Sequence, residues 1–343
     1  MIGLALRKTS ALSVPRYARQ SLLVSVSLFA LSLACTGFPS PGEPTPVSLT
    51  IQGTRALTDD DAYYRSPSWS PDGHLIGALR SQMAFDPAGS PSTEGDVVLF
   101  DLVSGGRQTI VGPPTVQPER ASAPLLWLPS GDGIAFYYYD FAVGQTAPFL
   151  ITYHRESGEL TTLDFCPCTQ IALSQDGDEM LVVDSPVGTF QLSWFNLVTG
   201  ERRAELSVPR QEPREHQYFG FSLSPDNHVL LLDDLNGSLF RYEIGSGQAP
   251  APFLFSAASP GWSPDGTKLV YASLSAFDAS YYYGQLVIAD ADGSFPEPLL
   301  PETQPVGMLS PAWSPDGTQI AFLYGTRHSN ALLIAEVPVN LRP

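Results

Sequence analysis

The stretch SPAWSPDGTQIAFLYG, residues 310–325, combines a tryptophan, a turn sequence and an alternating apolar run. Proline fixes φ at the first central position of such a turn, aspartate tolerates the second, and glycine takes the left-handed position that follows. The apolar run alternates with the period of a strand. The stretch therefore predicts a β-hairpin, although a serine and an aspartate this close together could also take part in catalysis.

The same pattern occurs six times. Each copy is anchored on a tryptophan or leucine just before the turn: Trp69, Trp127, Leu173, Leu223, Trp262 and Trp313. The anchors lie 58, 46, 50, 39 and 51 residues apart, and a second strand-like motif such as DVVLFDLVSGG follows each copy. A period of about 40–50 residues with four strands per unit is typical of propeller blades. The sequence thus predicts an all-β, six-bladed β-propeller with four-stranded antiparallel blades.

Repetition argues for a structural role of the turn residues, because six similar turns would imply six identical active sites. We interpret the aspartates as turn formers: Asp72, Asp226, Asp265 and Asp316. The large residue before each turn can fill the wedge between neighbouring blades. A proline two residues earlier is tolerable only on an innermost strand, whose edge faces the central channel. These prolines are Pro67, Pro260 and Pro311.

The two ends of the repeat region complete one blade. The sixth unit ends after ALLIAEVPVNLRP and lacks a fourth strand. Residues 47–57, which precede the first unit, match the connection that precedes the last one. We expect residues 47–57 to supply the missing strand of the last blade, which joins the chain ends and removes an exposed edge.

The repeat PAWSPDGTQIAF followed by LVIADADG resembles the propeller repeats of TolB-like proteins, a WD40-like group. The resemblance covers residues 47–343 and is stronger at Trp69, Trp262 and Trp313 than at Leu173 and Leu223. It implies a six-bladed propeller and a tendency to bind proteins, without naming a partner. TolB itself also carries a separate N-terminal α/β domain, for which the sequence before residue 47 leaves no room, so we do not expect this chain to be TolB.

The N-terminal region reads as a targeting segment. Residues 1–20 are basic and polar, and residues 21–34 form an apolar run of signal-peptide length, so residues 1–34 are predicted to be a signal peptide. SLAC, residues 32–35, resembles a bacterial lipoprotein signal in which Cys35 would be the lipidated residue. Ser32 departs from this pattern, because leucine is usual three residues before the cysteine. Ordinary signal peptidase would cut the same bond, between Ala34 and Cys35. Residues 35–46 are a proline-rich tether. We expect an exported protein at the outer face of a bacterial membrane, in the periplasm or at the cell surface, whose only membrane contact is the lipid.

Charge and cysteine content limit the partners. The formal net charge of −17 disfavours nucleic acid and anionic lipid surfaces and suits solubility or a basic partner. Outside the cytoplasm, Cys166 and Cys168 could form a disulfide, whose ring would be short and strained, or they are two small loop residues. We expect a monomer that recognises an envelope protein or an extracellular ligand.

Irregular insertions fall in the connections between second and third strands and between fourth and first strands, which open on one face. They include residues 80–96, 138–148 and 273–285. Tyrosine offers large contact area at low entropy cost, so we predict binding through the aromatic residues there, unless they pack the loops onto the body. These are Tyr63, Tyr64, Phe85, Tyr137, Tyr138, Tyr139, Phe141, Phe277, Tyr281, Tyr282 and Tyr283. The acidic run at residues 59–61 could hold Ca²⁺ but is more typical of a solvated loop.

The sequence offers no catalytic constellation. It has no Gly-x-Ser-x-Gly elbow and no room for an α/β-hydrolase domain. The five histidines show no metal-ligand spacing, so we expect neither a metal nor a cofactor. The favoured hypothesis is a non-enzymatic binding module at the cell envelope. The alternatives are a polysaccharide- or small-ligand-processing enzyme of the lyase or glycosidase type at the loop-side mouth of the channel, and a sensor or scaffold subunit.

Overall fold

The structure is a computed structural model. It describes residues 53–60, 62–81, 95–111, 125–138, 149–163, 170–174, 179–184, 190–196, 199, 201–208, 220–234, 237–278, 281–300, 307–325 and 330–343. All of them belong to one compact unit, Ser48–Pro343. Cys35, Cys166 and Cys168, with the predicted signal peptide and tether, lie outside the described residues.

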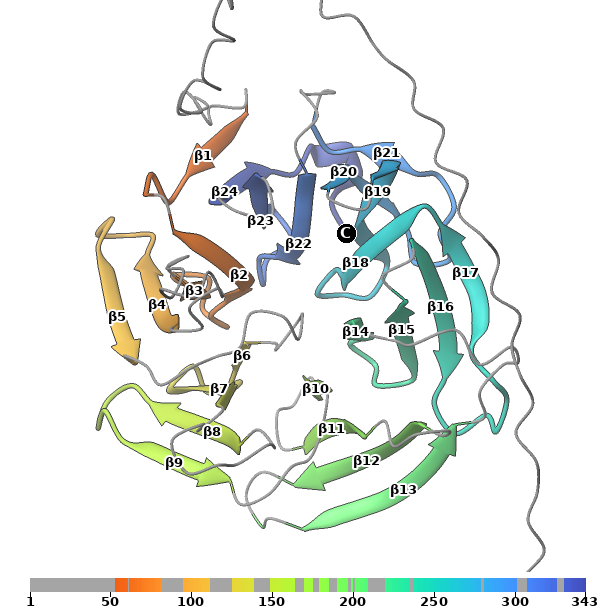
Figure 1. Cartoon of the computed structure of the whole chain (residues 1–343), viewed down its shortest axis with the longest axis horizontal. Helices are drawn as coiled ribbons and strands as arrows, with labels where there is room; N and C mark the ends of the chain where they lie inside the picture. The colour runs from red at the N-terminus through yellow and green to blue at the C-terminus, as the bar shows by residue number, and fades with distance from the viewer. Residues whose placement is uncertain are drawn as a thin grey trace, which may run out of the picture. The chain divides into compact units, whose positions relative to one another are not determined.

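The described unit is a six-bladed β-propeller of four-stranded antiparallel sheets, as the sequence predicts (Figure 1). Blade 1 is β2 (Tyr63–Trp69), β3 (Leu75–Ser81), β4 (Gly95–Asp101) and β5 (Arg107–Val111). Blade 2 is β6 (Leu126–Trp127), β7 (Gly133–Tyr138), β8 (Phe149–His154) and β9 (Leu160–Leu163). Blade 3 is β10 (Gln170–Leu173), β11 (Glu179–Asp184), β12 (Phe190–Asn196) and β13 (Arg202–Val208).

The second half of the ring repeats this plan. Blade 4 is β14 (Gly220–Leu223), β15 (Val229–Asp233), β16 (Ser238–Glu243) and β17 (Ala251–Phe255). Blade 5 is β18 (Ala257–Trp262), β19 (Lys268–Asp278), β20 (Tyr281–Asp290) and β21 (Glu297–Pro298). Blade 6 is β22 (Gly307–Trp313), β23 (Gln319–Gly325), β24 (Asn330–Glu336) and β1 (Thr54–Ala56). A short 3-10 helix, η1 (Val339–Leu341), follows β24, and no helix within the described residues is long and apolar enough to cross a membrane.

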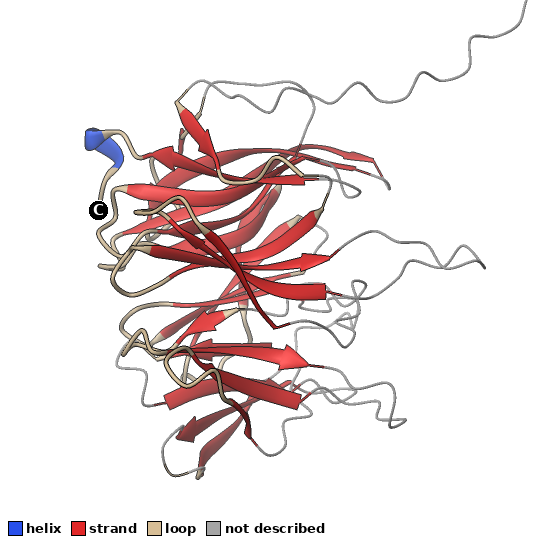
Figure 2. Ribbon diagram, turned by 90° about the vertical axis from the view of Figure 1, so that its left-hand side faces the viewer, coloured by secondary structure: helices blue, strands red, loops and turns tan. Residues whose placement is uncertain are grey.

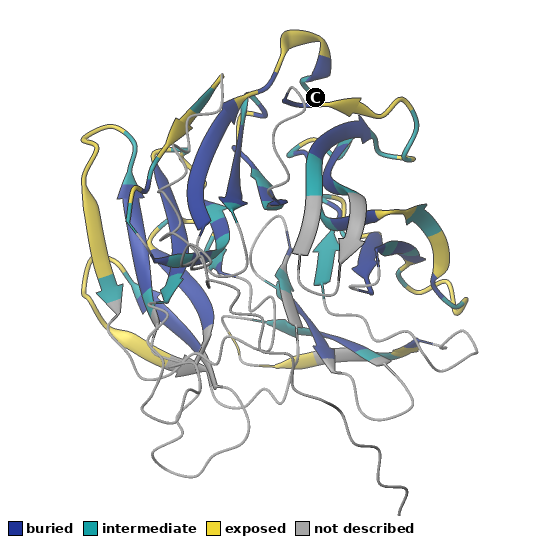
Figure 3. Cartoon of the chain, turned by 45° about the horizontal axis from the view of Figure 1, so that its top comes forward, coloured by how far each residue is buried: buried dark blue, intermediate teal, exposed yellow. Residues whose placement is uncertain are grey.

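The core is divided into apolar layers between neighbouring blades. One cluster joins β3 and β4 of blade 1 to β7 and β8 of blade 2, and another joins blade 5 to blade 6. Second strands are therefore buried on both faces: all five residues of β15 are buried, whereas outer strands such as β17 are largely exposed (Figure 3). This explains why second strands read as continuous apolar runs.

Tryptophan fills the wedge between blades, and its indole N–H also crosses to the preceding blade. Nε1 of Trp69 donates to the carbonyl of Ala312 in β22 at 3.0 Å. Nε1 of Trp127 donates to Ser68 in β2 at 3.0 Å, and Nε1 of Trp262 donates to Ser222 in β14 at 3.2 Å. These three anchors therefore couple neighbouring blades by packing and by a hydrogen bond, whereas Nε1 of Trp313 has no hydrogen-bond partner among the described residues.

The Ser-Pro pair before Trp69, Trp262 and Trp313 makes a bulge on an innermost strand. Ser66, Ser259 and Ser310 have φ of 49°, 52° and 50°, and the pairing register shifts at each of these positions. The following prolines lie in β2, β18 and β22, on the predicted innermost strands. A bulge leaves a residue outside the ladder, so the missing proline N–H removes no sheet hydrogen bond.

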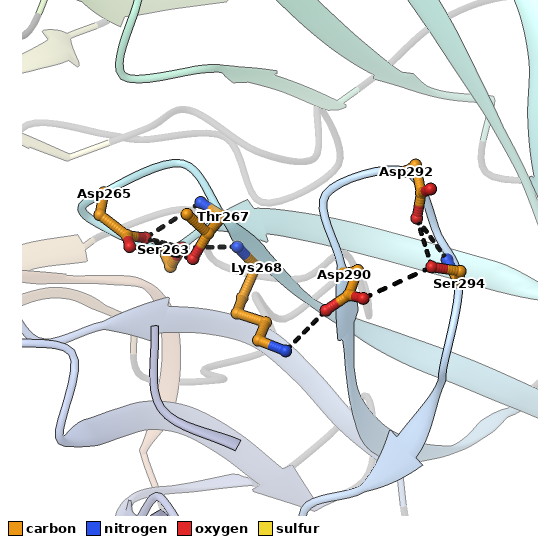
Figure 4. Close-up of polar contacts among 7 residues, drawn as sticks. All are labelled: Ser263, Asp265, Thr267, Lys268, Asp290, Asp292 and Ser294. Atoms are coloured by element: carbon orange, nitrogen blue, oxygen red, sulfur yellow. Dashed lines mark hydrogen bonds and ion pairs between the residues drawn. The ribbon is translucent and has the colours of Figure 1, made fainter. Parts of the chain in front are cut away.

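The Ser-Pro-Asp-Gly sequence forms the predicted turn, and in blade 5 its polar groups bond to one another (Figure 4). The Ser263 hydroxyl donates to Asp265 Oδ1 at 2.8 Å, and the backbone N–H of Thr267 donates to the same oxygen at 3.0 Å. The backbone N–H of Gly266 donates to Ser263 at 2.9 Å. Nζ of Lys268 lies 2.6 Å from Asp290 Oδ1, which ties this turn to the next one.

The N-terminal strand closes the ring, as predicted. Strand β1 pairs antiparallel with β24, with Arg55 opposite Ile334. Two buried polar side chains reinforce the junction: Thr58 Oγ1 accepts from the backbone N–H of Leu332 at 2.9 Å, and Asn330 bonds both backbone groups of Tyr64. The closure thus fastens blade 6 to blade 1 as well as completing blade 6.

Candidate functional site

The two ends of the propeller differ in construction. The short turns that join first to second and third to fourth strands gather at one end with η1, which we call the turn end (Figure 2). The remaining connections open at the opposite end, which we call the loop end. The sequence places the candidate binding site at the loop end, where the repeats differ most in length.

Three predicted binding tyrosines lie on the most extended hairpin of the loop end. Strands β19 and β20 have 11 and 10 residues, more than any other described strands. Tyr281, Tyr282 and Tyr283 begin β20, and Phe277 in β19 lies opposite Tyr282. The expectation of an irregular insertion at residues 273–285 was wrong, because the strands continue through most of it. Its many aromatic residues favour a strand.

Apart from Tyr63 and Tyr64, the other predicted aromatic residues fall in two groups. Tyr137 and Tyr138 end β7, at the edge of the loop end. Phe85, Tyr139 and Phe141 lie outside the described residues. The loop end therefore receives tyrosines from at least blades 1, 2 and 5.

Tyr63 stands at the loop-end start of β2 beside charged residues. The guanidinium carbon of Arg65 lies 5.2 Å from the centre of the Tyr63 ring, and burial lowers the pKa of Arg65. Arg80 and Asp96 form an ion pair between β3 and β4. A half-buried tyrosine stacked with a cation, next to an ion pair, is a polar surface suited to recognition.

Tyr64 does not belong to that surface, which corrects its prediction as a binding residue. Its side chain is fully buried and its ring lies 5.9 Å from that of Phe100. Its hydroxyl lies 3.0 Å from both carboxylate oxygens of Asp60, and burial, with the Asp60 charge, raises its pKa to about 12. Neighbouring strand residues point to opposite faces, so only one of two adjacent tyrosines can face outward.

The acidic run at residues 59–61 contributes a structural ion pair. Arg107 Nη1 lies 2.7 Å from Asp60 Oδ2. Burial alone would raise the pKa of Asp60, but the Arg107 guanidinium and the Tyr64 hydroxyl hold it below its usual value. Asp59 is exposed, and Asp61 lies outside the described residues. Among the residues that the structure describes, no group of three or more histidine, cysteine or acidic side chains could hold a metal ion.

Comparison with known proteins agrees with this architecture. TolB of Methylococcus capsulatus, a Tol-Pal system protein, is 30% identical over 124 residues, which are 34% of this chain and 28% of that protein. Crystalline TolB of Acinetobacter baumannii superposes with a TM-score of 0.55 at 18% identity, over 75% of this chain and 59% of that one. The chain is thus similar to TolB in part of its sequence, and it shares the β-propeller fold.

The fold is also similar to that of an enzyme. Oligogalacturonate lyase of Vibrio parahaemolyticus superposes with a TM-score of 0.55 at 10% identity, over 84% of this chain and 94% of that one. No protein-family model matches the chain. The curated relative is matched over less than a third of its length, so its partners do not transfer to this protein directly.

Proposed function

We propose that this protein is an exported, lipid-anchored binding module of the cell envelope, which recognises a protein partner through the loop end and catalyses no reaction. The observation that carries the proposal is the β19–β20 hairpin, the longest pair of strands in the described propeller, whose second strand begins with Tyr281, Tyr282 and Tyr283. A paired strand has a more regular backbone than a loop, and a segment rich in tyrosine offers large contact area at low entropy cost.

Two further features support a protein partner. The relatives that match part of the sequence are named Tol-Pal system proteins. At the loop end of blade 1, the half-buried Tyr63 lies with its ring 5.2 Å from the Arg65 guanidinium carbon, and tyrosine is enriched in protein interfaces. Anchoring rests on Cys35 and the apolar run before it.

The test is capture of partners from envelope extract. We expect the wild-type protein to retain a defined protein that is lost when Tyr281, Tyr282 and Tyr283 are replaced together by alanine. Phe295→Ala is the matched control, because Phe295 is 79% exposed but follows β20 at the turn end. Equal capture by all three proteins would contradict the role of the hairpin, and turnover of a polysaccharide by the purified protein would contradict a non-enzymatic module.

Anchoring is tested separately. Cys35→Ser should move the protein from the membrane fraction to the soluble fraction, because one lipidated residue supplies the membrane contact. An unchanged distribution would remove the lipid anchor from the proposal and leave the binding role standing.

A further inference from the structure

A cleft of about 620 Å³ lies at the turn end between blades 1 and 2. Three turns frame it: the β2–β3 turn with Asp72, the β6–β7 turn with Asp132, and the β8–β9 turn with Arg155 and Glu156. Its volume lies within the range of about 300–1,000 Å³ that is usual for ligand sites. The cleft is remote from the loop end, so it is a separate site from the one proposed above.

The cleft lies where blade 2 has a different residue type, directly after its third strand, from the other blades. In each of five blades, the residue after the third strand donates its backbone N–H to the first turn of the same blade: Leu102, Arg155, Ile244, Ala291 and Val337. Leu102, Ile244 and Val337 pack into the apolar layer between their blade and the preceding one. Blade 2 has an arginine instead, and an exposed guanidinium cannot fill that layer.

Arg155 is held in the wall of the cleft. Its Nη1 donates to the Gly131 carbonyl at 3.0 Å, and its guanidinium carbon lies 5.6 Å from the centre of the Trp127 ring. These contacts keep the side chain against blade 2. The space that an inward-pointing leucine would occupy is left to the cleft, whose apolar lining is Leu99, Ile110 and Tyr153.

The rim of the cleft is acidic. Asp72, Asp132 and Glu156 line it against the single cation Arg155, which leaves a formal charge of −2. The Ser70 hydroxyl and the His74 backbone N–H both donate to Oδ1 of Asp72, and these bonds lower its pKa. Its side chain is 56% exposed, so an ionised carboxylate meets the solvent at the rim. An acidic rim over an apolar floor suits a cation that carries apolar groups.

We propose that this cleft binds an extended peptide segment of a partner protein, with a lysine or arginine side chain at the acidic rim and a neighbouring apolar side chain on Leu99 and Ile110. The open framing by three turns suits a chain that passes across the surface. Gln108, which lines the cleft beside Ile110 on the outermost strand of blade 1, offers an amide to the peptide backbone.

The test uses fluorescence anisotropy with a fluorescein-labelled hexapeptide of alternating leucine and arginine, at an ionic strength of about 0.05 M. A hexapeptide of alternating leucine and glutamate is the charge control. We expect the arginine peptide to bind and the glutamate peptide not to bind. Failure of the arginine peptide to bind, or equal binding of both, would overturn the proposal.

A pair of charge-reversal variants of the full chain tests whether the peptide binds in the cleft. Glu156→Lys should weaken binding by about five- to tenfold, because it places a like charge at the rim, whereas Glu159→Lys makes the same net charge change outside the cleft and should change binding less than about twofold. Equal effects would mean that net charge alone attracts the peptide, which would overturn the site.

Arg155→Leu separates shape from charge. It introduces an apolar residue like those of blades 1, 4 and 6, so it should cover part of the apolar floor of the cleft and weaken binding even though it removes a positive charge. Stronger binding to this variant would overturn the proposed cleft, since charge alone predicts that result. The melting temperature of the Arg155→Leu variant shows whether this variant folds. If it does not fold, the comparison of Glu156→Lys with Glu159→Lys decides whether the peptide binds in the cleft.

Discussion

At the residue scale, each Ser-Pro-Asp-Gly turn is a closed polar unit. In blade 1 the Ser70 hydroxyl donates to Asp72 Oδ1 at 2.6 Å and accepts the backbone N–H of Leu75 at 2.8 Å. In blade 6 the Ser314 hydroxyl makes the equivalent bonds with Asp316 and Gln319. Serine and aspartate are therefore engaged with the turn itself, which explains their repetition without any catalytic role.

Gly317 tests the turn geometry. It has φ of +68°, and a Cβ there would lie 2.5 Å from Cγ of Pro343. Gly317→Val should lower the free energy of unfolding by about 2–3 kcal/mol, through a left-handed backbone and a collision with the C-terminus. Gly105→Val is the control, because Gly105 has φ of +72° with nothing within 4 Å, and should cost about 1–2 kcal/mol. Urea unfolding measures both, and an unchanged Gly317→Val midpoint would contradict the assignment.

The turn aspartates predict acid sensitivity. Hydrogen bonds from the serine two residues earlier and from the backbone lower the pKa of Asp72, Asp226 and Asp316 below 3.8. A pKa that is lower in the folded state gives stability that is present above the unfolded pKa and is lost as pH falls through the folded pKa. We expect the urea midpoint to fall steadily below about pH 4. Asp316→Asn, which cannot titrate, should flatten this dependence, and an equal slope in both proteins would contradict the linkage.

At the element scale, the ends of strands decide how blades join. Asn330 begins β24 and is 6% exposed. Its Oδ1 accepts the Tyr64 backbone N–H at 2.7 Å, and its Nδ2 donates to the Tyr64 carbonyl at 2.9 Å. The Asn330 side chain thus makes the two hydrogen bonds that a neighbouring strand would make, and it links blade 6 to blade 1. The repeat pattern does not predict this contact.

Asn330→Ala should cost about 2–3 kcal/mol in the free energy of unfolding, since it leaves both buried backbone groups of Tyr64 without a partner. Asn196→Ala is the matched control. Its Oδ1 accepts the Thr199 N–H in an exposed turn, where water can replace it, so a loss of about 0.5–1 kcal/mol is expected. Equal losses in chemical denaturation would show that the junction contributes no more than an ordinary turn.

At the scale of the whole molecule, closure of the ring depends on a strand from the far end of the sequence. Strand β1 covers the edge of β24, and Thr58 and Asn330 bind the same junction. A propeller without this strand would expose an edge and separate blade 6 from blade 1. The contacts span more than 260 residues of sequence, so they form only when the whole ring has assembled.

Deleting residues 47–57 should therefore lower the melting temperature strongly and promote aggregation, whereas deleting residues 36–46 should leave it nearly unchanged. Differential scanning calorimetry on both deletions checks this. Both deletions remove 11 residues before the first blade, so the comparison isolates the closing strand. Equal tolerance of both would contradict closure by β1.

The number of blades and their turns could be predicted from the sequence because they are encoded in a local pattern that occurs six times. The innermost prolines followed from three copies of that pattern, and the closing strand followed from counting four strands per blade. Three features became evident only in the folded structure: Tyr64 is buried, residues 273–285 are mostly strand, and Arg155 lines a cleft between two blades. The physical reason is that burial and cavities depend on what a neighbouring blade presents. The sequence of each repeat encodes the strands of one blade, but the contacts between that blade and its neighbours form only when the ring closes.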